Sequence, residues 1–460
     1  AKRAPGRGMV RRPPVPGPTA AESDPTGALV RRGIMAAAVT TGVFVVMLAR
    51  HATPAGGTAA GAVGSPKAEA PAFDADPAQW PAFRGPGGLG LAAAAAATDW
   101  DGPSGRGILW KQPLPRAGFS SAIVWRDRLC LTGADEQTRE LYCLDARDGR
   151  LLWTSAATDI VGSPAKLPEV GPDTGFAAAT PVTDGRCVVA IFATGDVLAT
   201  DVDGKRLWAR NLGVPDNPYG HASSLQLHQG RVLVQYDHFG SARFIALDAA
   251  TGETVWEQKR EVRASWASPI LVRTDSRVVA VLNADPTAEA FDAVTGERLW
   301  ACKCMGGEVA PSPAYSNGLA FVTTDYVTLA AIRLSGDQAG TIAWQKDEEL
   351  PDVCTPLAVN GLLFVANGAG IISCYQAATG ELKWRQETDE GYYSSPVAAG
   401  GNVYLTDRKG KTRIVKAADA YTPVAECVLG EDVVSTPAIV GGRLYLRYDD
   451  NLYAFDIKGP

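Results

Sequence analysis

The residues best able to do chemistry lie beside a phrase that recurs along the chain. It is a Ser/Thr-Pro pair, then a few residues, then Gly or Asp and an alternating apolar segment, in eight copies when degenerate ones are counted. When the copies are aligned, half of the preceding positions are small or aliphatic and the rest carry large side chains. The candidate binding residues chosen there and beside them are Tyr219, His221, Trp266, Glu308, Asp352, Tyr392, Tyr393 and Asp432. Imidazoles and carboxylates bind metals, whereas exposed Tyr and Trp favour protein interfaces.

Three interpretations of these candidates stay open. The side chains could fill a channel or cap strand ends, they could bind a protein or peptide, or they could hold a small molecule or metal. His228 and His238 are expected in separate turns, so one metal would not gather them with His221. The combination that merits a metal test is His221 with Glu308 or Asp352. No catalytic residue and no metal ligand is assigned from the sequence.

Eight cysteines add a second kind of reactive group. Outside the cytoplasm an even count permits disulfides. Cys130 and Cys143 could face each other across a hairpin, and Cys354 and Cys374 would share one repeat. The alternative is that most of these thiols are small buried apolar groups. The chain has no adjacent Cys-Cys pair and no C-x-x-C-H haem motif.

A tryptophan closes a second recurring phrase, as in D-A-A-T-G-E-T-V-W and D-A-V-T-G-E-R-L-W. The Gly of this phrase is expected at positive φ in a turn, and the Trp is expected to wedge between neighbouring sheets. The tryptophans, about 40 to 55 residues apart, are Trp110, Trp153, Trp208, Trp256, Trp300, Trp344 and Trp384, and Cys427 takes the place in a degenerate copy. We interpret them as structural docking residues.

This spacing predicts an all-β fold, because a repeat of 40 to 45 residues with four short strands is a propeller blade. We expect an eight-bladed β-propeller of four-stranded antiparallel blades over residues 106–460. The strand 108–111 would complete the last blade beside residues 444–457, leaving no free edge strand. The candidate binding residues would then lie in the central channel or at one rim.

The first 105 residues differ in composition from the repeats. Residues 1–32 are basic and rich in Pro and Gly, and we interpret them as a disordered cytoplasmic tail. The uncharged run 33–49 would span about 25 Å as a helix, near the lower limit for a bilayer core of about 30 Å. We interpret it as a transmembrane anchor; a cleaved signal or a buried helix are the alternatives. We expect residues 50–79 to form a flexible linker and residues 80–105 to form a leader that packs on the ring.

Charge asymmetry places the N-terminus in the cytoplasm and the propeller outside it. The expected location is therefore a bacterial cell membrane, crossed once, with a periplasmic or otherwise extracytoplasmic ring. A net charge of −6 and a pI near 5.4 give no basic field for nucleic acid. Expected partners are other membrane or exported proteins, and the ring itself is expected to be monomeric.

The repeats resemble the PQQ-like β-propeller family, whose tryptophan-docking phrase reads roughly A-x-D-x-x-T-G-x-x-x-W. The match covers about residues 106–460, and W-P-A-F-R-G-P-G-G-L-G from Trp80 looks like the leader that precedes such propellers in many bacterial membrane-associated proteins. The family contains quinoprotein alcohol dehydrogenases, which bind PQQ with calcium and carry adjacent cysteines. It also contains a BamB-like branch that binds no cofactor and acts as a protein-binding scaffold. The lean repeats here resemble that branch, although no lipobox Cys stands near the apolar run.

The resemblance implies a membrane-anchored, non-catalytic scaffold without a cofactor. The alternative from another class is a PQQ- and calcium-dependent oxidoreductase, and a further alternative is the sensor ectodomain of a signalling protein. Absent Cys-Cys and haem motifs favour the scaffold over the enzyme.

Overall fold

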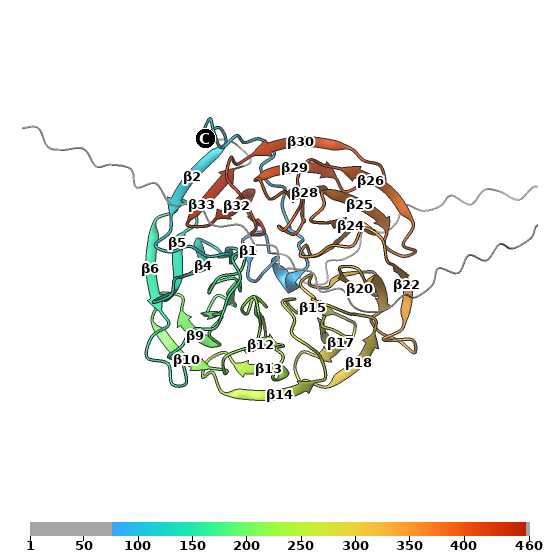
Figure 1. The fold of residues 1–460 in the computed structure, drawn as a ribbon. Coiled ribbons are helices and arrows are strands. Elements are labelled where there is room, and N and C mark those ends of the chain that lie inside the picture. The colour runs from blue at the N-terminus through green and yellow to red at the C-terminus, as the bar shows by residue number, and fades with distance from the viewer. Residues whose placement is uncertain (1–75, 457–460) are drawn as a thin grey trace, which may run out of the picture. The chain divides into compact units, whose positions relative to one another are not determined.

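Eight small antiparallel sheets are arranged around a central axis in the computed structural model, which describes residues 76–456 (Figure 1). The predicted tail 1–32, anchor 33–49 and nearly all of the linker 50–79 lie outside the described residues. Within residues 76–456 no helix is long and apolar enough to cross a bilayer, the one helical element being the short η1 (Pro86–Gly88). The described residues all belong to one compact unit, 66–460.

Each sheet is one blade; blades 2 to 7 are built from four consecutive strands, whereas blade 1 takes in β1 and blade 8 takes in β2 from earlier in the chain. Blade 1 has β1 (Gln79–Trp80), β3 (Ile123–Trp125), β4 (Arg128–Ala134), β5 (Arg139–Asp145) and β6 (Leu151–Ala156). Blade 2 has β7 (Val182–Thr183), β8 (Cys187–Ile191), β9 (Asp196–Asp201) and β10 (Arg206–Asn211). Blade 3 has β11 (Gln226–His228), β12 (Arg231–Tyr236), β13 (Ala242–Asp248) and β14 (Thr254–Arg260). Blade 4 has β15 (Ile270–Arg273), β16 (Val278–Leu282), β17 (Thr287–Asp292) and β18 (Arg298–Lys303).

The second half of the ring repeats this plan. Blade 5 has β19 (Ala314–Ser316), β20 (Leu319–Thr324), β21 (Thr328–Arg333) and β22 (Ile342–Lys346). Blade 6 has β23 (Leu357–Val359), β24 (Leu362–Ala366), β25 (Ile371–Gln376) and β26 (Leu382–Glu387). Blade 7 has β27 (Val397–Ala399), β28 (Asn402–Thr406), β29 (Lys411–Lys416) and β30 (Pro423–Val428). Blade 8 has β31 (Ala438–Val440), β32 (Arg443–Tyr448), β33 (Asn451–Asp456) and β2 (Ile108–Pro113).

Blade 8 joins the two ends of the propeller. Strand β2 pairs antiparallel with β33, with Trp110 opposite Ala454 and Lys111 opposite Tyr453. The expected eight-bladed ring of four-stranded blades is therefore confirmed, including its closure by the strand near Trp110.

The turn phrase works as the sequence predicts at Asp292–Gly296. The Asp292 carboxylate accepts the main-chain N–H groups of Val294 and Thr295, each at 2.9 Å, and Gly296 has a φ of 75°. The face of Trp256 from the preceding blade lies against this glycine, where a Cβ would fall 2.6 Å from the ring. The indole Nε1 of Trp256 then donates to the Val294 carbonyl at 3.0 Å. A Cβ atom at this position is therefore excluded for two reasons, namely the positive φ and the contact with the indole.

The same docking recurs around the ring. Indole N–H groups donate across the blade boundary from Trp153, Trp208, Trp300, Trp344 and Trp384 to the carbonyls of Val202, Ala249, Leu334, Ala377 and Ala418. Trp110 packs on Gly149, but its Nε1 has no partner among residues 76–456. Each indole therefore buries one face between two sheets, as a wedge must.

The segment before β2 runs from blade 1 across the ring centre to blades 7 and 8. It starts as β1, which adds a fifth strand to blade 1, and Trp80 is buried there. After η1, at the centre of Figure 1, Leu91 lies beside Ala398 of blade 7 and Asp101 beside Val428.

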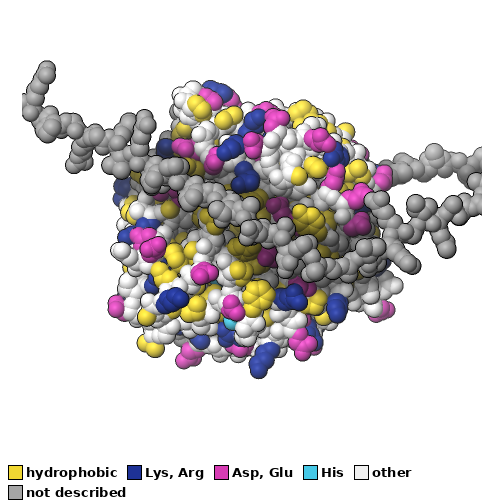
Figure 2. Space-filling view, in the orientation of Figure 1, with side chains coloured by type: hydrophobic (Ala, Val, Ile, Leu, Met, Phe, Trp, Pro, Cys, Tyr) yellow, Lys and Arg dark blue, Asp and Glu magenta, His cyan; other side chains and the backbone are white. Residues whose placement is uncertain are grey.

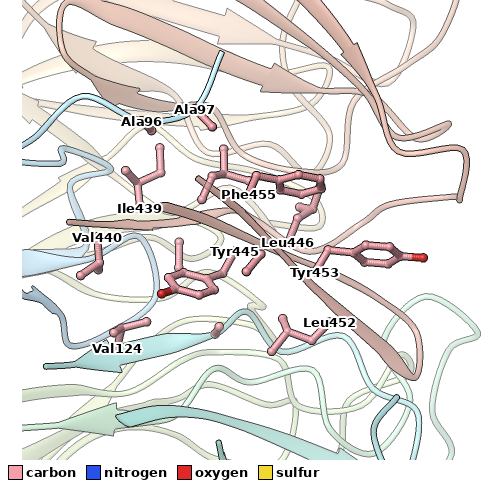
Figure 3. Close-up of a cluster of buried hydrophobic side chains, with 14 of the residues drawn as sticks. Ala96, Ala97, Val124, Ile439, Val440, Tyr445, Leu446, Leu452, Tyr453 and Phe455 are labelled. Carbon is pink, nitrogen blue, oxygen red and sulfur yellow. The ribbon is translucent and has the colours of Figure 1, made fainter. Parts of the chain in front are cut away.

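The end of this segment packs where blade 7 lacks a tryptophan. The Cys427 thiol donates to the Thr98 carbonyl at 3.4 Å, and the ring of Trp100 stacks 4.8 Å from Phe455. Ala96 and Ala97 belong to the same hydrophobic cluster as Ile439 and Phe455 (Figure 3). The leader 80–105 therefore fills a gap that a docking indole fills elsewhere.

Candidate functional site

A closed ring of hydrogen bonds surrounds the axis at the level of the Ser/Thr-Pro phrases. Each blade contributes one hydroxyl side chain, and these are Ser121, Thr180, Ser224, Ser268, Ser312, Thr355, Ser395 and Thr436. The main-chain N–H of each donates to the hydroxyl oxygen in the next blade, at 2.8 to 3.1 Å. The recurrent Ser or Thr is thus explained by contact between blades.

All eight hydroxyl residues line one cavity of about 770 Å³ on the axis. The residue two positions before the hydroxyl residue also lines the cavity, as Trp266, Ala310, Val353, Tyr393 and Val434 do. Figure 2 shows hydrophobic side chains, coloured yellow, interspersed with charged side chains over one face of the propeller. This cavity is the candidate functional site.

Aromatic side chains form much of the cavity wall. The rings of Tyr219 and Trp266 lie 5.2 Å apart, and Trp266 Nε1 donates to the Gly220 carbonyl at 3.0 Å, which fixes the indole. Tyr326 is 93% exposed and Tyr219 44% exposed, so the cavity opens to solvent on their side. Exposed aromatic groups around a concavity are typical of interfaces.

The charges that line this cavity are all negative. Asp173, Glu308, Asp325 and Asp352 contribute carboxylates, and no Lys, Arg or His is among the lining residues. Burial, and then the charge of Asp352, raises the pKa of Asp325. Asp352 itself accepts the Gly368 N–H at 2.9 Å. The mouth therefore carries a negative field that favours a cationic group.

The inner end of the cavity is closed by the leader. Phe83 lines the cavity, and the guanidinium of Arg84 donates through Nη2 to the carbonyls of Pro356 and Pro396 at 3.0 and 3.2 Å. These prolines directly follow the hydroxyl residues Thr355 and Ser395. Burial lowers the pKa of Arg84 to about 9. Access is consequently from the rim of Tyr219 and Tyr326.

Five of the eight sequence candidates meet in this cavity, namely Tyr219, Trp266, Glu308, Asp352 and Tyr393. His221 does not, because the lining position in its blade belongs to Ala222. His221 is buried inside the ring wall, 5.1 Å from the Tyr236 ring, and burial lowers its pKa to about 4. The proposed grouping of His221 with Glu308 or Asp352 is absent, and residues 76–456 contain no cluster of three metal-ligating side chains.

The other two candidates lie outside the cavity. The Tyr392 hydroxyl accepts from Arg413 Nη1 at 3.1 Å in a buried cluster with Asp407. Asp432 is exposed and pairs with Lys409 at 3.1 Å, beside a second hollow of about 530 Å³.

Several cavity residues could not be found by aligning the repeats of this chain. Asp173, Asp325 and Tyr326 lie in loops outside the Ser/Thr-Pro phrase, and Phe83 comes from the leader. Loop residues carry no repeat register, so alignment of the blades could not place them. Tyr326 has a φ of 59°, a backbone feature that a sequence pattern does not announce.

All eight cysteines are free thiols, and neither of the two possible disulfides is formed. Cys130 does lie directly opposite Cys143 on the neighbouring strand, as the hairpin reading required. The Cys354 thiol instead donates to the Ser394 carbonyl at 3.4 Å. Burial raises the pKa of Cys187 and Cys374 to about 12, which keeps these thiols protonated.

The fold and the cavity define an eight-bladed propeller with tryptophan-docked blades and a rim-facing axial site. The model of the family described as outer membrane protein assembly factor BamB matches residues 91–236, 193–339 and 331–422. The chain belongs to this family.

Curated relatives and solved structures agree with this assignment. Proteins named outer membrane protein assembly factor BamB are 24% identical over 264 residues in Moranella endobia and 25% over 286 residues in Yersinia pestis. These matches span 53% and 57% of this chain, and 66% and 70% of the relatives. A protein named tetrathionate hydrolase, from Acidithiobacillus ferrooxidans, is 24% identical over 58% of this chain and 53% of its own length.

Two solved structures share the fold. BamB from Moraxella catarrhalis superposes with a TM-score of 0.56 at 16% identity, covering 76% of this chain and 97% of its own. A quinohemoprotein alcohol dehydrogenase from Pseudomonas putida gives 0.63 at 12% identity, covering 84% of this chain and 81% of its own. At these identities the likeness concerns architecture, which non-enzymes and enzymes share.

Proposed function

We propose that this protein is a membrane-anchored, non-catalytic scaffold that binds other membrane or exported proteins through the rim around the axial cavity. The observation that carries the proposal is the aromatic mouth, formed by the exposed Tyr219 and Tyr326 and by the buried Trp266 that lines the cavity beside Tyr219. Aromatic anchors in a concave, partly desolvated place are where binding energy concentrates in protein interfaces. The relatives named as assembly factors support a role in assembly.

The location belongs to the same proposal. The apolar run 33–49 anchors the chain, the basic tail before it stays in the cytoplasm, and the propeller faces the extracytoplasmic side. Alkaline phosphatase fused after residue 456 would be active if the ring is exported. An inactive fusion, with an active cytoplasmic reporter at the same junction, would contradict the location.

The cavity does not fit PQQ with calcium. PQQ is a tricarboxylate, and the lining supplies four carboxylates and no cationic side chain to balance it. Within residues 76–456 no three carboxylate, His or Cys side chains converge to hold a calcium ion with it. We therefore derive no reaction step through this cofactor and propose a scaffold without one.

Photocrosslinking in cells tests the proposed rim. A benzophenone amino acid at Tyr326 should give a discrete adduct, whereas the same group at Leu382, an exposed position on the outer strand β26, should not. The adduct should disappear when Trp266→Ala is added. Equal adducts from both positions, or an adduct that survives Trp266→Ala, would rule out this rim as the binding surface.

A further inference from the structure

We propose that the axial cavity binds Lys or Arg side chains of an extended polypeptide segment. This inference rests on the proposed protein-binding rim and names the chemistry of what that rim takes. It depends on three features of the same cavity: unpaired carboxylates at the mouth, aromatic walls and a floor of hydroxyl groups.

The mouth carries the charge for this ligand. Within the described part of the chain, Asp173, Glu308, Asp325 and Asp352 form no ion pair, so their charges are not neutralised by the protein itself. The effect of Asp352 on the pKa of Asp325 shows that two of them repel each other. A cationic side chain placed between them would relieve that repulsion and gain Coulomb attraction.

The walls suit the same ligand. Trp266 and Tyr219, whose ring centres lie 5.2 Å apart, line the cavity together with Tyr393 and Phe119. The face of an aromatic ring attracts ammonium and guanidinium groups, and its apolar surface packs against the methylene stem of Lys or Arg. Arg408 already uses this interaction, with its guanidinium 4.5 Å from the centre of the Tyr393 ring.

The floor supplies an independent argument for a polar ligand. The eight hydroxyl residues are each at most 5% exposed, yet each hydroxyl oxygen spends only one acceptor position, on the N–H of the preceding blade. Among residues 76–456 no acceptor takes the hydroxyl hydrogens of this ring. Their free lone pairs can accept hydrogen bonds from an ammonium group, and their hydrogens can donate to the water it brings.

The size of the cavity favours a polypeptide over a free amine. A volume of about 770 Å³ is in the range of sites that hold drug-sized ligands and exceeds one Lys side chain. Tyr326 and Val327 continue the apolar surface outward from the mouth, where the residues flanking a bound Lys would lie. The neighbouring hollow has mixed charge, with Arg408, Lys409 and Arg447 beside Asp173, Glu390, Asp432 and Asp449, whereas the lining of the axial cavity carries carboxylates and no cation.

Peptide binding to the solubilised full chain tests this inference. The probe is a fluorescein-labelled peptide of Gly, Ser, two Tyr and three Lys, and the matched peptides carry norleucine or Glu in place of Lys. Fluorescence anisotropy should show the Lys peptide binding about tenfold or more tightly than the norleucine peptide, with the difference shrinking at high salt. The Glu peptide should bind most weakly.

Matched variants locate the effect. The triple variant Glu308→Gln, Asp325→Asn, Asp352→Asn removes three charges from the mouth and should abolish the preference for Lys. The triple variant Glu253→Gln, Glu297→Gln, Glu381→Gln removes the same charge from exposed blade turns and should leave the preference intact. The unfolding midpoints of both triple variants show whether the fold is retained. If the first triple variant unfolds, Asp325→Asn alone replaces it in the peptide-binding test, because it removes a charge that Asp352 repels.

The outcomes separate the inference from the proposed function. No preference for Lys over norleucine, or equal losses in the two triples, overturns the inference. If Tyr326 still gives its discrete crosslink in that case, the rim binds a protein by other chemistry. If both the peptide preference and the crosslink are missing, the proposed function falls as well.

Discussion

The main-chain N–H of Thr436 donates to the Ser121 hydroxyl at 3.0 Å and so joins blade 8 to blade 1 at the axis. Strand β2 joins the same two ends of the propeller at the periphery, since it pairs with β33 and carries Trp110 onto Gly149 of blade 1. The ring is thus closed at two radii.

Gly252 should be far more sensitive to alanine than Gly230. Both have positive φ, 74° and 73°, but a Cβ at Gly252 would lie 2.5 Å from the Trp208 ring, whereas Gly230 has open space. Gly230→Ala should cost about 1 to 2 kcal/mol for backbone strain alone. Gly252→Ala should cost at least about 1 kcal/mol more, because the indole must move. Urea unfolding of the two variants measures the difference, and equal losses would contradict the docking role.

Trp256→Phe should destabilise the fold more than Trp110→Phe. Both changes remove similar apolar area, but only Trp256 donates an indole hydrogen bond, to Val294, within residues 76–456. The excess should be about 1 kcal/mol, the usual net value of one hydrogen bond plus an orphaned acceptor. Differential unfolding in denaturant checks this. A larger loss for Trp110→Phe would mean that packing of the indole between the sheets, and not its hydrogen bond, determines which variant is less stable.

Arg260 should be a stability determinant of the ring wall. Its guanidinium is fully buried and pairs with Asp237 and with Glu289, the latter at 2.7 Å. Arg260→Met should cost about 3 to 5 kcal/mol, because it leaves buried carboxylates uncompensated. Arg298→Met removes a half-exposed partner of the same Glu289 and should cost less than about 1 kcal/mol. Thermal unfolding of the two variants measures the losses. Comparable losses would show that the burial of Arg260 does not explain its contribution to stability.

His221 should make the protein less stable as the pH falls below neutrality. Its folded pKa of about 4 lies below the unfolded value near 6.5, so the unfolded chain binds the proton first. The free energy of unfolding is therefore unaffected by this group above about pH 6.5. It falls progressively between pH 6.5 and pH 4, by roughly 3 kcal/mol in all. The variant His221→Asn should flatten this part of the curve. Free energies of unfolding of both proteins, measured at pH 7.5 and 5.5, test this prediction. An equal decrease in the two proteins would exclude His221 as its cause.

The blade architecture could be predicted because its determinants repeat in register. The Asp-x-x-Thr-Gly turn, the docking Trp and the Ser/Thr of the axial ring make contacts that recur from blade to blade, so each residue type recurs at regular spacing in the sequence. The same repeats predicted closure of the ring, because the strand near Trp110 precedes the first blade and the last repeat lacks one strand.

The site was only partly predictable, because its residues break the repeat. Trp266 and Tyr393 were found by aligning the blades on the Ser/Thr-Pro phrase, but Asp173 and Asp325 lie in loops outside that phrase. His221 was selected although its neighbour Ala222 holds the lining position, since adjacent residues in an extended chain point to opposite sides. The buried pairing of Tyr392 with Arg413 joins residues of one blade that no spacing rule links.

The closed hydroxyl ring also limits how the channel can respond to a ligand. Its circumference is set by eight hydrogen bonds between residues in rigid strand ends, so it cannot dilate without breaking at least one of them, at about 1 kcal/mol each plus the lost packing. With Arg84 and Phe83 beneath it, the passage does not conduct a chain from one face to the other. A bound segment must enter and leave by the same mouth, so its release rate is governed by the rim alone.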